Sequence, residues 1–177
     1  ILHSRALSFS LEGDYTRDIL YVSALYEQRD TIHVMMCHLP SQLGGAANTD
    51  WKRQRAKLLL QSQIDSILLL HPSANIVVMG DMNTSPQDDL MGMTNLMLPI
   101  QKAGQGTHKY QGIWTCLDQF YVSAALIPQS TATIFSPPWL LEEDTKYLDT
   151  QPHRTYVGFR YHDGYSDHLP VVLTIQK

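Results

Sequence analysis

Residues 74–80, with the sequence ANIVVMG, form a short continuous apolar run that includes the β-branched residues Ile76, Val77 and Val78. Such a run has apolar side chains on both faces of a strand, so it predicts a strand that is buried on both sides. A chain of 177 residues is long enough to bury a substantial core as one domain, and we predict a single domain over residues 1–177.

The segments around this run predict an α+β protein dominated by sheet. Alternating residues at 5–11, 19–26 and 31–38, joined by short turns at 12–14 and 27–30, indicate an antiparallel meander. Residues 50–71 carry apolar side chains at helical spacing, and Thr49 or Asp50 is the expected cap. Further along we expect a short helix near 84–89, a hairpin turn at Gln111-Gly112, a strand over 113–123, a long loop or insertion over 128–153 and a last strand over 169–176.

Composition limits the classes of function. A formal net charge of −4 argues against a protein whose whole surface binds nucleic acid, but it leaves room for a local basic groove. One basic cluster lies on the predicted helix, where it indicates a solvated face: Lys52, Arg53, Arg55 and Lys57. The two cysteines, Cys37 and Cys116, lie in strand-like runs, which favours buried free thiols. No apolar run approaches the ~18 residues of a membrane span.

Polar residues suited to chemistry stand where predicted strands begin or end. They are His38, Asp81, Asn83, Asp118, Asp167 and His168. Sites at strand ends are held more firmly than sites on loops, because the sheet fixes their geometry.

Asp81 and Asn83 lie two residues apart in GDMN, and in an extended backbone both side chains project to one face. The carboxylate can then take a proton from water while the amide donates to an oxyanion. The alternative is that both are turn residues that cap the segment after them.

His168 needs a carboxylate partner to hold one tautomer and to stabilise its charged form, and Asp118 on a neighbouring strand is the candidate. Asp167 is the natural ligand for a hard cation such as Mg²⁺, with Mn²⁺ as an alternative. Zinc is disfavoured as the ion of this set of residues, because the set contains neither clustered cysteines nor an HExxH helix. His38, taken alone, is also explained as a strand-end histidine bonded to backbone.

Four motifs in order, HLPS (38–41), GDMN (80–83), WTCLDQF (114–120) and SDHLPV (166–171), resemble those of the endonuclease/exonuclease/phosphatase superfamily, the DNase I-like group. The resemblance runs from about Thr31 to the C-terminus and is strongest to bacterial members. It implies a four-layer α/β/β/α sandwich. It also implies that Asp81 activates water, Asn83 and His38 contact phosphate, His168 contacts the scissile phosphate with Asp118 fixing its ring, and Asp167 binds Mg²⁺.

This resemblance also implies motifs that the chain lacks, namely an Asn strand and a metal-binding Glu before residue 1. Glu12, Glu27, Glu142 and Glu143 do not stand in the required order. We therefore expect an N-terminally truncated domain, whose targeting region and compartment the sequence leaves unknown. We also expect weak Mg²⁺ binding, and exposed sheet edges that invite homo-oligomerisation.

The expected function is metal-dependent hydrolysis of a phosphate ester, either in nucleic acid or in a small-molecule or lipid phosphate. Candidate substrate contacts are Lys109, Tyr110, Arg154 and Tyr165. The two basic residues are equally explained as ordinary surface charge, and aromatic residues in strands more often serve packing. The alternative function is a non-catalytic binding scaffold, or a catalytically impaired fragment.

Overall fold

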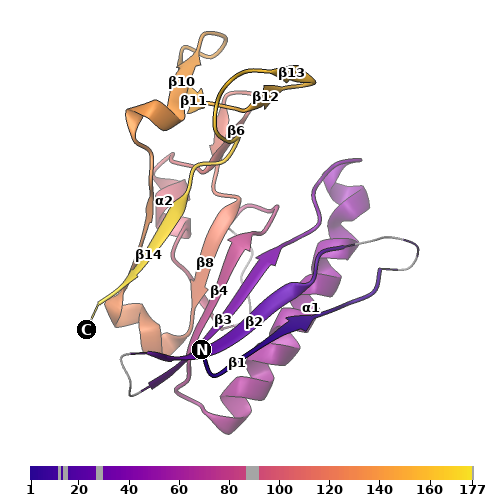
Figure 1. Ribbon diagram of the computed structural model, residues 1–177, viewed down its shortest axis with the longest axis vertical. Coiled ribbons are helices and arrows are strands. Elements are labelled where there is room, and N and C mark those ends of the chain that lie inside the picture. The colour runs from indigo at the N-terminus through magenta and orange to yellow at the C-terminus, as the bar shows by residue number, and fades with distance from the viewer. Residues whose placement is uncertain (12, 14–15, 27–29, 87–91, 177) are drawn as a thin grey trace.

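The computed structural model describes residues 1–11, 13, 16–26, 30–86 and 92–176. Its main element is a six-stranded sheet (Figure 1). The strands lie in the order β1 (His3–Leu7), β2 (Ile19–Tyr26), β3 (Asp30–His38), β4 (Asn75–Asp81), β8 (Asp118–Val122) and β5 (Thr94–Asn95). The expected turns at 12–14 and 27–30, the expected helix near 84–89 and the residues Glu12 and Glu27 lie wholly or largely outside the described ranges.

The predicted meander is confirmed, since β1, β2 and β3 pair antiparallel. The β3–β4 pair is parallel, and α1 (Ala46–Leu70) makes the crossover between these two strands. Parallel neighbours require such a crossover because a tight turn cannot join them. Both strands therefore end at the same edge of the sheet, which matters for the site below.

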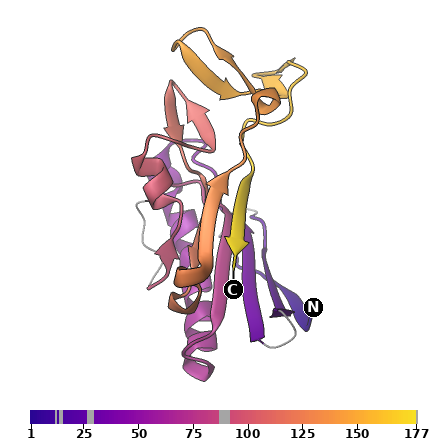
Figure 2. The same ribbon diagram turned by 90° about the vertical axis from the view of Figure 1, so that its left-hand side faces the viewer.

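Helix α1 covers one face of the sheet (Figure 1). Its Ala56, Leu60, Ile64 and Ile67 form a buried cluster with alternate strand residues, among them Ile19, Tyr21, Met35, Cys37, Ile76, Val78 and Tyr121. The second face packs on a two-stranded sheet of β9 (Ser130–Ile134) and β14 (Val171–Ile175), as Figure 2 shows from the side. Residues Val77, Phe120, Val122, Cys116 and Leu126 are buried there. The predicted doubly buried strand is thus confirmed.

The start of α1 differs from the prediction. The helix begins at Ala46, four residues before the expected start, and Gly45 is its cap without any capping side chain. Thr49 lies inside the first turn, where its hydroxyl donates to the Gly45 carbonyl over 3.0 Å. The predicted solvated basic face was also partly wrong, because Arg53 is 1% exposed and Lys57 is 8% exposed.

The hairpin predicted at Gln111-Gly112 is confirmed between β6 (His108–Tyr110) and β7 (Ile113–Thr115). Both turn residues have positive φ, 50° and 81°, as a type I′ turn requires. The expected single strand over 113–123 is instead interrupted at residues 116–117, so that β7 belongs to this hairpin and β8 to the main sheet.

The expected loop or insertion over 128–153 is largely ordered structure. It contains β9, the short 3-10 helix η2 (Pro138–Leu140) and the hairpin of β10 (Leu141–Asp144) and β11 (Asp149–Pro152). A smaller hairpin of β12 (Tyr156–Val157) and β13 (Arg160–Tyr161) follows, and both project from one end of the molecule (Figures 1 and 2). The remaining elements are α2 (Leu98–Lys102) and η1 (Ala124–Gln129). Within the described ranges, no helix has the length and apolar character needed to cross a membrane.

Candidate active site

Three of the predicted site residues lie side by side at one edge of the sheet. His38 ends β3, Asp81 ends β4 and Asp118 begins β8, and the register pairs His38 with Asp81 and Asp81 with Asp118. Paired positions on neighbouring strands place their side chains on the same face. His38 Nε2 accordingly lies 3.5 Å from Asp81 Oδ2.

His168 joins this group from the C-terminal segment. Its Nδ1 lies 2.7 Å from Asp118 Oδ2, as the sequence analysis predicted for the pair. The segment is held against β6, because Leu169 N–H donates to the Thr107 carbonyl over 2.7 Å and His168 forms a bridge with His108. With Nδ1 engaged by the carboxylate, Nε2 is the ring nitrogen left to contact a substrate.

The electrostatics of the site favour the charged forms of His168 and Asp118 and raise the pKa of the neighbouring Asp81 carboxyl group. Burial alone would lower the pKa of His168, but the hydrogen bond and charge of Asp118 outweigh it and raise that pKa. Burial would raise the pKa of Asp118, but hydrogen bonds from His168 and Thr107 lower it below its ordinary value. Asp81 behaves in the opposite way, since burial together with the nearby Asp118 charge raises its pKa despite the hydrogen bond from Asn83.

Asn83 does not adopt the extended backbone on which its predicted orientation depended. Its φ is 50°, and its N–H donates to Asp81 Oδ1 over 2.8 Å, which makes GDMN a turn closed by the Asp81 side chain. The Asn83 amide donates to the Leu39 carbonyl over 2.9 Å and lies 3.3 Å from Asp81 Oδ2. Asn83 is therefore at the site, but a phosphate would have to replace one of these contacts.

Gly80 is required immediately before this turn. Its φ is 131°, and a Cβ there would lie only 1.9 Å from the Cys37 carbonyl oxygen of the neighbouring strand. A larger residue would push β3 and β4 apart at the point where His38 and Asp81 meet.

Asp167 lies beside His168 and is exposed. The potential metal-ligand atoms of His108, Asp167 and His168 lie within 4.8 Å of one another. His108 was missed by sequence reasoning; burial and the charges of His168 and Arg154 lower its pKa, and its ring centroid lies 4.9 Å from that of His168. The signal that could have found it is the predicted hairpin turn, which sets His108 opposite Thr115 and so near Asp118.

The four candidate substrate contacts occupy different environments. Lys109 is 2% exposed, and its ammonium lies 2.9 Å from Asp149 and 3.2 Å from Asp144. These hydrogen bonds raise its pKa although burial would lower it, so the geometry favours a structural role. Arg154 donates to the Lys109 carbonyl over 2.6 Å and lies close enough to His108 to affect its pKa. Tyr110 and Tyr165 are 66% and 58% exposed.

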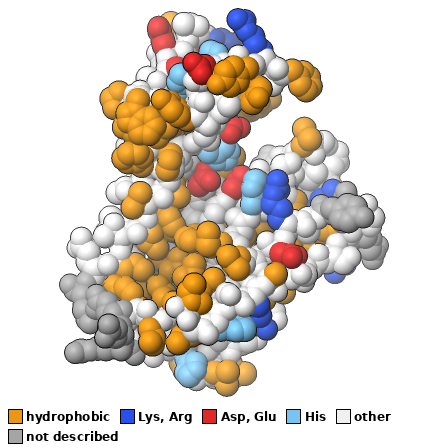
Figure 3. Space-filling model, in the orientation of Figure 1, with side chains coloured by type: hydrophobic (Ala, Val, Ile, Leu, Met, Phe, Trp, Pro, Cys, Tyr) orange, Lys and Arg blue, Asp and Glu red, His pale blue; other side chains and the backbone are white. Residues whose placement is uncertain are grey.

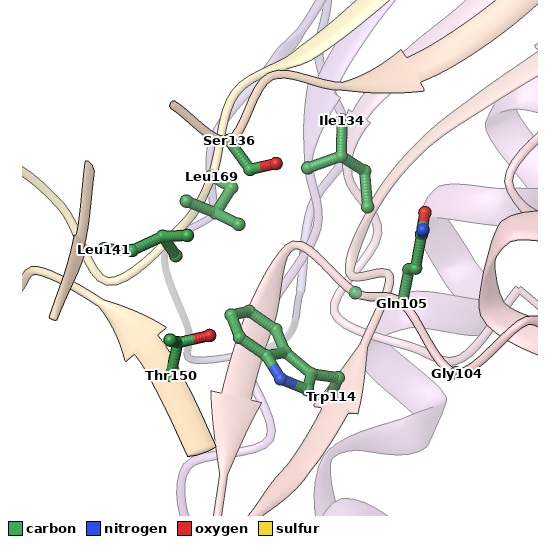
Figure 4. A pocket seen from close by; sticks show the side chains of 9 residues that line it. Gly104, Gln105, Trp114, Ile134, Ser136, Leu141, Thr150 and Leu169 are labelled. Atoms are coloured by element: carbon green, nitrogen blue, oxygen red, sulfur yellow. The ribbon is translucent and has the colours of Figure 1, made fainter. Parts of the chain in front are cut away.

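In the space-filling view, acidic and histidine side chains gather in a hollow between the projecting hairpins and the rest of the molecule (Figure 3). A separate cavity of about 290 Å³ lies nearby (Figure 4), and its lining includes Trp114, Ile134, Leu141 and Leu169. None of the candidate catalytic residues lines this cavity, although Leu169 follows His168 in the chain. We place the site at the hollow because the titratable side chains converge there.

Among models of protein families, that of the endonuclease/exonuclease/phosphatase family matches residues 3–177. A comparison with curated protein sequences gave no match.

Many solved structures share the fold. The structure of truncated TDP2 from Caenorhabditis elegans matches with a TM-score of 0.66 and 15% identity over 99% of this chain and 66% of its own. D. rerio TDP2 complexed with a single strand DNA product matches with a TM-score of 0.58 and 15% identity over 98% and 66%. The human Nocturnin catalytic domain with bound sulfate matches with a TM-score of 0.55 and 14% identity over 98% and 57%. This chain thus spans somewhat less than two thirds of these solved chains, and the predicted DNase I-like fold class is confirmed.

Proposed function

Because the chain belongs to the endonuclease/exonuclease/phosphatase family, we propose that its site hydrolyses a phosphate ester by direct attack of water on phosphorus. The observation that carries this proposal is the hydrogen-bonded Asp118–His168 pair beside the Asp81 carboxylate. A scaffold that only binds a partner has no physical need for this arrangement, in which partly buried charges must be paired.

Each of these residues has a distinct part. Protonated His168 donates from Nε2 to a phosphoryl oxygen, and Asp118 stabilises the imidazolium through Nδ1. Asp81, whose pKa is raised by burial, is the base that takes a proton from the attacking water. His38, next to Asp81, can donate to a second phosphate oxygen. Together these donors stabilise the negative charge of the transition state.

The possible ligands around Asp167 fit Mg²⁺ only in part, because they include a single carboxylate. Asp167 offers one carboxylate that is not engaged by His168, and the neighbouring ligand atoms are the imidazole nitrogens of His108 and His168. Mg²⁺ prefers oxygen and is often held by one or two carboxylates with water and substrate phosphate. Asp167 would hold the ion, which would neutralise phosphate charge when bound. We expect weak affinity, so calorimetric titration should show no tight Mg²⁺ binding unless a phosphate ligand is present.

The direct test is hydrolysis of bis-p-nitrophenyl phosphate by this chain with Mg²⁺. We expect release of p-nitrophenolate that falls at least about 100-fold in His168→Ala, because the phosphate donor is lost. The exposed His71→Ala is the matched control and should keep full activity. Inactivity of the folded wild-type protein with Mg²⁺ present would instead favour the binding scaffold or the impaired fragment.

The pH dependence of this activity gives a second check. The base must be ionised and the histidine protonated, so the rate should follow a bell-shaped curve. We expect the midpoint of its acid limb to lie above pH 3.8, the ordinary pKa of aspartate, because the pKa of Asp81 is raised. The alkaline limb should lie above 6.5, the ordinary value for histidine, because the pKa of His168 is raised.

Substrate choice follows from charge and shape around the site. The net charge of −4 and the burial of Lys109 disfavour extended contacts with duplex DNA. Exposed Tyr110 and Tyr165 are suited to stacking on an unpaired base or sugar, and a relative was solved with a single strand DNA product. Rates on a single-stranded oligonucleotide, its duplex and a small phosphate ester would separate these substrates; a preference for the duplex would contradict the inference.

A further inference from the structure

A second cluster of metal-ligating side chains lies outside the candidate active site, where the projecting hairpins join. It consists of Glu142 on β10, His153 just after β11 and His162 just after β13. The ligand atoms of these three residues all lie within 4.8 Å of one another. We propose that Glu142, His153 and His162 bind a divalent transition metal of the zinc class.

Both imidazoles are aimed at the same carboxylate oxygen. His162 Nε2 lies 2.6 Å from Glu142 Oε2, and His153 Nε2 lies 3.8 Å from the same atom. Ligands placed about 2.1 Å from a tetrahedral ion are separated by about 3.4 Å. The two distances lie on either side of this value, so small side-chain shifts would admit an ion.

The contacts around the cluster hold the ligands in place before any ion arrives. Gln151 donates to Glu142 Oε1 over 2.9 Å, which leaves Oε2 to face the histidines. The His153 ring packs edge-on against His162 and Tyr165, with centroids 5.6 and 5.8 Å away. Such outer contacts, which fix ligand orientation, are typical of metal sites.

The chemistry of the donors selects the ion. Two imidazoles and one carboxylate form a set typical of zinc with an open fourth position, whereas Mg²⁺ and Ca²⁺ prefer oxygen alone. The side chains of Glu142, His153 and His162 are 19%, 30% and 41% exposed, so an ion can enter and water can complete its shell.

The backbone connects this cluster to the candidate active site. The His153 carbonyl accepts hydrogen bonds from the N–H groups of Tyr165 and Ser166, over 2.7 and 3.2 Å. Gly164 allows this close approach, since a Cβ there would lie 2.3 Å from the His153 carbonyl oxygen. An ion bound by both His153 and His162 would link the two ends of residues 153–162. The chain continues from this segment to Asp167 and His168.

The test is binding of Zn²⁺ to chelator-treated protein by calorimetry, with Co²⁺ absorption to report the geometry. We expect one ion per chain at this site, and shifts of the His153 and His162 ring signals in NMR spectra. His162→Ala and the similarly sized Glu142→Gln should each weaken binding at least about 100-fold, because loss of a direct ligand exceeds the 10- to 100-fold cost of losing an outer contact. His168→Ala, which disrupts only the other cluster, should leave this binding unchanged.

Circular dichroism spectra would show whether the variants fold. If His162→Ala does not fold, Glu142→Gln still tests the proposal. Absence of Zn²⁺ binding in the wild-type protein would overturn the proposal. It would equally be overturned if binding survived in both cluster variants and was lost in His168→Ala, since the metal would then belong to the candidate active site.

Discussion

The Asp118 carboxylate accepts a hydrogen bond from His168 Nδ1 over 2.7 Å, and both pKa values shift in the direction that favours charge. The raised pKa of His168 stabilises the fold fully below pH 6.5, and this stability is lost as the pH rises through the raised value. The lowered pKa of Asp118 stabilises the fold above pH 3.8, and this stability is lost as the pH falls through the lowered value. The pair therefore contributes most between these two limits.

Asp118→Asn should remove this contribution. We expect the free energy of unfolding near pH 5.5 to fall by about 1–3 kcal/mol, as for a lost hydrogen bond to a charged group, with a smaller loss at pH 9. NMR titration should show a lower pKa for His168 in the variant. Asp65→Asn on the exposed side of α1 is the control, and an unchanged His168 pKa in Asp118→Asn would contradict the assignment.

At the scale of residues, the sequence predicts a contact where two side chains each need a hydrogen-bonding partner. Asp118 and His168 were matched because a buried carboxylate and a strand-end histidine each need a partner. No such chemical need points to His108, whose place follows from the hairpin that pairs it with Thr115 and from its bridge to His168. The turn at Asn83 agrees with the alternative interpretation of GDMN, in which Asp81 and Asn83 are turn residues, and the extended backbone expected for the catalytic orientation was wrong.

Arg53 ties helix α1 to the segment that follows His38. Its guanidinium donates to the carbonyls of Pro40, Ser41 and Ala46 and to the Thr49 hydroxyl, over 2.9 to 3.3 Å. Removal of this fully buried side chain would break these part-buried hydrogen bonds and leave an unfilled space in the core, and both effects are destabilising.

We expect Arg53→Ala to lower the free energy of unfolding by about 2–4 kcal/mol, whereas the exposed Arg55→Ala should change it by no more than about 0.5 kcal/mol. Urea denaturation followed by circular dichroism measures both. Equal stability of the two variants would show that the Arg53 contacts contribute nothing to the fold.

Predictability at the scale of elements follows the strength of the local pattern. The long helix, the buried run at 74–80 and the type I′ turn have distinctive periodicity or turn residues, and all three are present. Strand β9 was missed because STATI alternates small residues, and its pairing partner β14 lies far along the chain. The early start of α1 was missed because Gly45 caps it without a side chain.

Across the whole molecule, apolar side chains are exposed on the sheet face beside β14 (Figure 3). Leu20 and Met36, which are paired on β2 and β3, are 43% and 44% exposed. Strand β1 also leaves one edge of the sheet unpaired among the described residues. Exposed apolar faces and free edges promote association, and we propose that copies of this chain associate there.

Sedimentation velocity over a range of protein concentrations should reveal this association. Leu20→Lys and Met36→Lys should shift the equilibrium toward monomer, because a charge on the face must be desolvated on contact. Leu58→Lys, on the exposed side of α1, is the control, since Leu58 is 64% exposed and lies on the other side of the sheet. A wild-type protein that is monomeric at every concentration would contradict the proposal.

The two free thiols lie in different cores, Cys37 beneath α1 and Cys116 beneath the β9–β14 pair. Burial raises the pKa of Cys37 to about 12 and that of Cys116 to about 11, so neither reacts with iodoacetamide until its own core opens. The rate at which each cysteine is alkylated in mild denaturant, measured by peptide mass spectrometry, therefore reports how often its own core opens. We expect Cys116 to be modified first because short elements cover its core, among them β9, β14, α2 and η1, whereas the 25-residue helix α1 covers Cys37. Matching rates would instead mean that both halves open in one cooperative event.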